Sequence, residues 1–125
     1  MSEAKANELE ERLLDFAVRV GKIVDALPDS RMGKHIAGQL VRAGTSPAPN
    51  YAEACGAESK NDFIHKLGIV FKELRESRIW LRMVIKSQLI PAKRMNAVHD
   101  ECEQLCNIIG KSLLTAKTNR SKRNP

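Results

Sequence analysis

Five basic side chains recur between residues 72 and 86 at spacings that would gather them on one side of a helix. This basic ridge consists of Lys72, Arg75, Arg78, Arg82 and Lys86. At about 100° per residue, all five fall within an arc of ~120° beside the apolar face. Glu73 and Glu76 fall outside that arc. Such a row of cations is typical of proteins that bind phosphate backbones without reading sequence. The alternative is a solvated helix face that acids on neighbouring helices balance.

A second basic element lies at the C-terminus. Lys and Arg number 21 and Asp and Glu number 15, a net charge of +6, and residues 111–125 contain five bases and no acid. We expect the bases of the tail to add to phosphate binding: Lys117, Arg120, Lys122 and Arg123. Neither element has the interleaved aromatic residues that stack on single-stranded bases. The pattern therefore favours recognition of the RNA or DNA backbone.

The residue types that could perform catalysis or hold a metal ion form weaker patterns. His99, Cys102 and Cys106 would share one helix face, but a structural zinc site needs four ligands, and small core residues explain both cysteines. Arg94 and His99 form an R-x4-H pattern similar to the ribonuclease motif of HEPN domains, which makes a ribonuclease a remote alternative. No phosphate-binding glycine loop or nucleophile motif occurs. We predict a protein without catalytic residues, metal or cofactor.

The elements that would position these side chains follow from the apolar spacing. The chain has 125 residues, of which 42% are hydrophobic, 29% charged and 4% aromatic, a composition typical of one helical domain. Leu, Leu, Phe, Val, Ile and Leu at positions 9, 13, 16, 20, 23 and 27 predict a first helix that ends at Pro28. The second helix spans about 31–43, with Met32, Ile36, Leu40 and Ala43 facing inward.

Residues 44–50 contain two prolines that kink this second helix, which continues to Gly56. The third helix spans about 60–87, with Phe63, Leu67, Val70, Leu74, Ser77, Leu81 and Val84 facing inward. Pro91 opens the fourth helix at its first position. These elements predict an all-α, antiparallel up-down four-helix bundle whose second helix is kinked near Ser46–Pro49. We assign residues 1–117 to the bundle domain and 118–125 to a basic, flexible tail.

A further stripe of the third helix bears Ile69, Trp80 and Met83. Tryptophan is enriched at protein interfaces, so this stripe is a candidate oligomer contact. The alternative is that it covers an edge of the bundle. The N-terminus lacks the apolar region of a signal peptide, and no apolar stretch approaches the roughly 18 residues that cross a bilayer. With three cysteines, these features predict a cytoplasmic protein without a membrane contact.

The stretch 39–84 resembles the family of 23S ribosomal RNA intervening-sequence proteins. Its members share the pattern Q-L-x-R-A-x-x-S-x-x-x-N-x-A-E, which this sequence matches at Gln39, Leu40, Arg42, Ala43, Ser46, Asn50, Ala52 and Glu53. The start and centre of the third helix match at Ser59, Asp62, Phe63, Lys72, Glu73 and Leu74. Two departures are Pro47 and Tyr51, where the family often has isoleucines, and Ala54-Cys55-Gly56, where glycine usually follows the glutamate directly.

The resemblance implies a four-helix bundle that assembles as a homopentamer in bacteria, with nucleic-acid binding as the usual conjecture. The family is also similar to the accessory protein of diversity-generating retroelements, which binds a reverse transcriptase and its RNA. A protein-interaction scaffold is therefore the main alternative function. We interpret the motif residues as structural: Ser46 caps or kinks the helix, Asn50 satisfies backbone groups near Pro47 and Pro49, and Arg42 pairs with Glu53 across helices.

Overall fold

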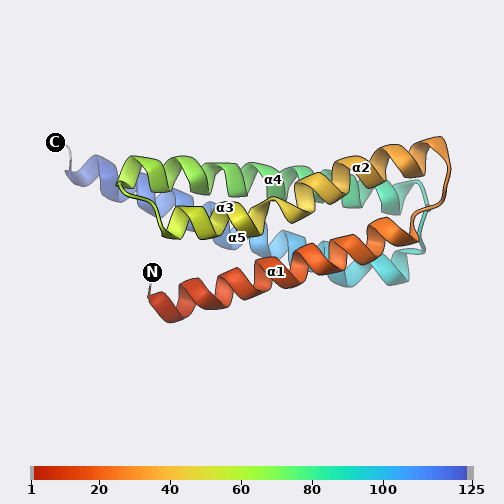
Figure 1. The fold of residues 1–125 in the computed structure, drawn as a ribbon, viewed down its shortest axis with the longest axis horizontal. Coiled ribbons are helices and arrows are strands. Elements are labelled where there is room, and N and C mark those ends of the chain that lie inside the picture. The colour runs from red at the N-terminus through yellow and green to blue at the C-terminus, as the bar shows by residue number, and fades with distance from the viewer. Residues whose placement is uncertain (1, 124–125) are drawn as a thin grey trace.

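The bundle is described by a computed structural model that covers residues 2–123. Its helices are α1 (Glu3–Ala26), α2 (Arg31–Thr45), α3 (Pro47–Cys55), α4 (Lys60–Lys86) and α5 (Ala92–Arg123). Helices α2 and α3 follow each other end to end as one bent helix. When this pair is taken as one element, α1, the bent helix, α4 and α5 run in alternating directions (Figure 1). The predicted antiparallel up-down four-helix bundle with a kinked second helix is therefore confirmed.

Serine side chains begin three of the helices. The hydroxyl oxygen of Ser2 accepts the amide N–H of Lys5 at 3.2 Å, and that of Ser30 accepts the amide of Gly33 at 3.0 Å. Ser59 accepts the amide of Asp62 at 3.1 Å. Each bond satisfies a backbone donor that the first turn of a helix leaves free. Helix α5 starts at Ala92, one residue later than predicted.

The bend between α2 and α3 is centred on Ser46. Its backbone remains helical, with φ −72° and ψ −37°, so the helix changes direction without a loop. Pro47 and Pro49 cannot donate to the preceding turn, which removes two of the hydrogen bonds that keep a helix straight.

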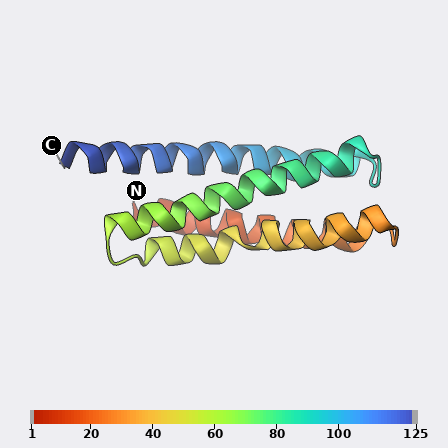
Figure 2. The same ribbon diagram turned by 90° about the horizontal axis from the view of Figure 1, so that it is seen from above.

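Helix α1 packs against α2, α3 and α5, and α4 packs against the same three helices. Helices α1 and α4 therefore occupy opposite corners of the bundle (Figures 1 and 2). Nearly all residues predicted to face inward are buried. The exceptions are Met32, which is exposed, and Leu27 and Phe63, which are only partly covered. Gly33 is buried beside Met32 because it backs directly onto the Pro28 carbonyl, which turns the methionine outward.

One close approach between helices depends on Gly44 in α2. A Cβ atom at this position would lie 2.6 Å from Cγ1 of Val20 in α1, well inside van der Waals contact. The absence of a side chain thus lets α1 and α2 lie close together.

The segment assigned to a basic tail, 118–125, continues helix α5 as far as Arg123. The Arg120 guanidinium donates to Oδ1 of Asn61 at 3.2 Å, which ties this turn to the start of α4. Residues 124–125 lie outside the described chain. Within the described chain, no helix combines the length and the apolar character that spanning a membrane requires.

Candidate nucleic-acid interface

Four members of the basic ridge project from α4 into solvent: Lys72, Arg75, Arg82 and Lys86. Across residues 2–123, no carboxylate lies within salt-bridge distance of these four. Their charges are therefore available to an external anion.

Arg78, the central member, behaves differently. Its side chain is only 27% exposed, and its Nη1 lies 3.5 Å from Oε2 of Glu103 in α5. The predicted phosphate contact of Arg78 stays a prediction, and Glu103 competes for its guanidinium. This position points along the line where α4 meets α5, so its charge is partly neutralised within the bundle.

An aromatic ring lies within the ridge, contrary to the expectation of an aromatic-free surface. The Arg75 guanidinium carbon is 5.5 Å from the centroid of the Phe71 ring, within the range of a cation–π contact. Phe71 is half-buried. The sequence shows Phe71 directly before Lys72, but only the helix geometry shows that Arg75 lies over the ring.

The bases of the C-terminal segment divide in a similar way. Lys117 and Lys122 are exposed, and Arg120 is partly covered and bonded to Asn61. The side chain of Arg123 lies outside the described part of the molecule. Because Lys117, Arg120 and Lys122 lie on α5, the helix fixes the spacing between them.

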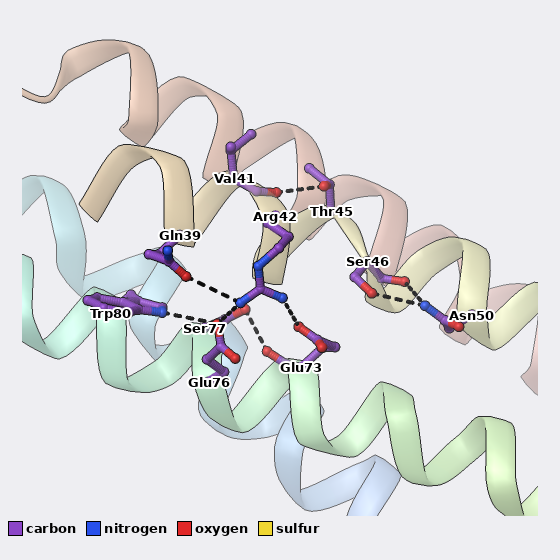
Figure 3. Close-up of polar contacts among 10 residues, drawn as sticks. All are labelled: Gln39, Val41, Arg42, Thr45, Ser46, Asn50, Glu73, Glu76, Ser77 and Trp80. Carbon is purple, nitrogen blue, oxygen red and sulfur yellow. Dashed lines mark hydrogen bonds and ion pairs between the residues drawn. The ribbon is translucent and has the colours of Figure 1, made fainter. Parts of the chain in front are cut away.

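Arg42 and Glu73, two of the motif residues, form a charged cluster with Glu76 between α2 and α4 (Figure 3). Arg42 Nη1 donates to Oε2 of Glu73 at 3.1 Å, and Nη2 donates to Glu76. The Glu73 side chain is 11% exposed and that of Arg42 is 51% exposed. The predicted Arg42–Glu53 pair is wrong, since Glu53 instead lies 3.9 Å from Lys66. Arg42 lies in the last turn of α2 and reaches α4, whereas Glu53 lies beyond the bend.

Ser46 and Asn50 bridge the bend itself. The Asn50 side-chain amide donates to both the carbonyl oxygen and the hydroxyl oxygen of Ser46, each at 2.9 Å (Figure 3). Asn50 therefore satisfies backbone at the kink, as expected. The Ser46 hydroxyl makes no capping bond to the backbone of α3. Of the two roles predicted for Ser46, cap or kink, the structure has the kink, where the hydroxyl is the acceptor of Asn50.

The candidate oligomer stripe lies along the same edge. The Trp80 indole N–H donates to Oε2 of Glu76 at 3.2 Å, and its ring meets His35 of α2 edge-on at 5.7 Å between centroids. Trp80 and Met83 are partly buried against the core, and Ile69 is also partly covered. Trp80 covers the edge between α2 and α4 through its contact with His35, and the role of the three side chains in an oligomer stays a prediction.

The two cysteines of α5 are buried in the seam, as expected for core residues. The Cys102 thiol donates to the carbonyl oxygen of Leu74 at 3.4 Å. Its hydrogen bond with Cys106 and its burial both raise the pKa of Cys102, and the same hydrogen bond lowers the pKa of Cys106, with a contribution from Arg78. Among residues 2–123, no group of three His, Cys, Asp or Glu side chains has an arrangement that could hold a metal ion.

Arg94 and His99, the R-x4-H pair, have different surroundings. Arg94 is exposed near the start of α5, and His99 is partly buried with Nε2 at 3.6 Å from Oε1 of Glu103. No hydrogen bond joins the pair in the described structure. The fold therefore adds no geometric support to a ribonuclease site.

Comparison with known proteins supports a helical-bundle class. The fold is similar to the crystal structure of a protein with unknown function from the S23 ribosomal protein family of Bacteroides thetaiotaomicron. The two chains are 28% identical, with a TM-score of 0.78, and the match covers 84% of this chain and 97% of that one. The family model described as 23S rRNA-intervening sequence protein matches residues 5–111, so this chain belongs to that family. A search of curated proteins found no significant match.

Proposed function

We propose that this protein is a non-enzymatic, cytoplasmic RNA-binding bundle whose ridge on α4 contacts phosphates without reading sequence. The observation that carries the proposal is the row of four exposed bases, Lys72, Arg75, Arg82 and Lys86, that lack an acidic partner in the described structure. Lys117 and Lys122 extend the positive surface at the end of α5. DNA presents the same phosphate chemistry and would bind through the same ridge.

The test is a salt titration of RNA binding. Each phosphate that a base neutralises releases counterions, so four contacts give a slope of log K against log salt of about −3. We expect Lys86→Glu to weaken binding and to make this slope shallower by about one contact. Lys22→Glu is the matched control, because it makes the same charge change on the exposed outer side of α1. A flat salt dependence, or equal effects of the two variants, would overturn the proposal.

Self-association is the second part of the proposal, with a homopentamer as the expected assembly. Large apolar side chains are exposed at two opposite corners of the bundle, Leu14 and Val18 on α1 and Ile79 on α4, which supports a separate contact with a further copy at each corner. An oligomer would present several ridges to one RNA and raise its affinity through multivalency. Light-scattering mass with and without RNA measures both properties, and a monomeric mass would refute the assembly.

A protein partner is the alternative occupant of the apolar surface. In that case charge reversal on the ridge would leave binding of the protein partner intact, and substitution of Leu14 or Val18 would abolish it.

A further inference from the structure

Two shallow hollows meet on the α4–α5 side of the bundle, at Phe71 and Arg75. The first has a volume of about 300 Å³ and lies between Phe71, Arg75 and Arg78 of α4 and Asn107, Lys111 and Leu114 of α5. The second, of about 340 Å³, shares the three α4 residues and extends along that helix past Lys72. The ridge thus borders a concave strip rather than a smooth convex surface.

Glycines on both helices keep this strip open. A Cβ atom at Gly110 would lie 3.1 Å from Cε1 of Phe71, a tight contact that would require the ring to shift by a few tenths of an ångström. At Gly68 nothing lies within 4 Å of the corresponding position. The Phe71 ring therefore lies close against α5 at Gly110, and neither glycine places a side chain over it.

The walls combine the groups that a single nucleotide needs. A base that is not paired or stacked binds to planar aromatic and guanidinium groups, and here Arg75 lies over Phe71. Leu114 is 67% exposed and adds apolar surface at the rim. Asn107 is exposed and offers both a donor and an acceptor to a base edge. Lys72 and Lys111 flank the strip, where they can contact the phosphates on either side of a base.

We propose that this strip binds one unpaired nucleotide of a single-stranded RNA, with its base against Phe71 and Arg75. The inference rests on the proposed function and deepens it, since it specifies the form of the RNA. A volume near 300 Å³ is at the small end of the range for ligand sites, which favours a single nucleotide over a longer segment. Duplex RNA keeps its bases stacked inside the helix, so it can use the ridge but cannot fill the strip.

The experiment compares two RNA probes by fluorescence anisotropy at one salt concentration: an unstructured oligonucleotide and a duplex of equal total charge. Phe71→Leu keeps an apolar side chain but removes the ring, so we expect it to weaken binding of the single strand roughly tenfold. Leu114→Ala and Asn107→Ala, both at exposed positions, are expected to weaken the single strand severalfold. All three leave duplex binding unchanged. Met32→Ala, at an exposed position at the start of α2, is the control and changes neither.

The outcomes separate the two proposals. If Lys86→Glu weakens both probes while Phe71→Leu, Leu114→Ala and Asn107→Ala change neither, the ridge binds phosphate and the nucleotide site is refuted. If the three strip variants weaken both probes equally, the strip contacts phosphate only and the base contact is refuted. Failure of both RNAs to bind refutes the proposed function together with this inference. Because Leu114 and Asn107 lie on the surface, their variants decide the question even if Phe71→Leu does not fold.

Discussion

Removal of the Arg42 guanidinium tests the charged cluster between α2 and α4. Arg42→Met keeps the apolar stem but leaves the Glu73 carboxylate, which is 11% exposed, without its donor. Loss of a hydrogen bond to a charged group costs about 1.5–3 kcal/mol. The more exposed arm to Glu76 adds only about 0.2–1 kcal/mol. Because Arg42 itself is 51% exposed, water replaces part of the interaction, and we expect a loss of about 2 kcal/mol of unfolding free energy.

The assay is urea unfolding followed by far-UV circular dichroism. A second substitution, Glu73→Gln, removes the uncompensated charge, so Arg42→Met/Glu73→Gln is expected to recover about half of the loss. Glu53→Gln is the matched control, because its contact with Lys66 is 3.9 Å long and exposed, and its effect stays below about 0.5 kcal/mol. Equal effects of Arg42→Met and Glu53→Gln, or a larger loss on addition of Glu73→Gln, would refute a stabilising role of the Arg42–Glu73 pair.

Two further predictions concern packing and pH. Gly44→Ala forces a Cβ against Val20 and is expected to cost about 1–3 kcal/mol, whereas Gly38→Ala, in open space, is expected to stabilise α2 by up to ~1 kcal/mol. Thermal unfolding of the two variants checks the pair, and equal melting temperatures would contradict the close approach of α1 and α2. Burial raises the pKa of Tyr51 above its ordinary value of 10.0, so the native phenol stays protonated at pH values where the unfolded chain ionises. The unfolding free energy is therefore expected to fall above about pH 10, by up to ~1.4 kcal/mol per pH unit, and Tyr51→Phe to fall less steeply; parallel pH curves for the two proteins would exclude this contribution.

The fold was predictable because its signals are local. Apolar spacing identifies each helix, and the two prolines identify the bend before any tertiary contact is known. The outward position of Met32 was not predicted, because it depends on the contact of Gly33 with the carbonyl of Pro28, on the other side of the α1–α2 turn.

The site was predictable only in part, because partner choice is a tertiary property. Exposure of the ridge follows from the periodicity of α4, but Arg78 meets Glu103 only when α5 packs alongside. The sequence offers several carboxylates as partners for Arg42. Only the bend between α2 and α3 in the folded chain determines that Glu73 pairs with its guanidinium. The position of Arg75 over the Phe71 ring likewise needs the side-chain geometry of a formed helix.

The continuation of α5 to Arg123 has an electrostatic consequence for its last turn. Carbonyl groups at the end of a helix lack internal donors and carry partial negative charge. Arg120 and Lys122, in the last turn of α5, are cations that compensate this charge. If the proposed phosphate ligand engages the same cations, it withdraws them from the helix end, so ligand binding and fraying of the final turn would be thermodynamically linked. The terminus of α5 would then divide its cations between its own carbonyl oxygens and the oxygens of a bound phosphate.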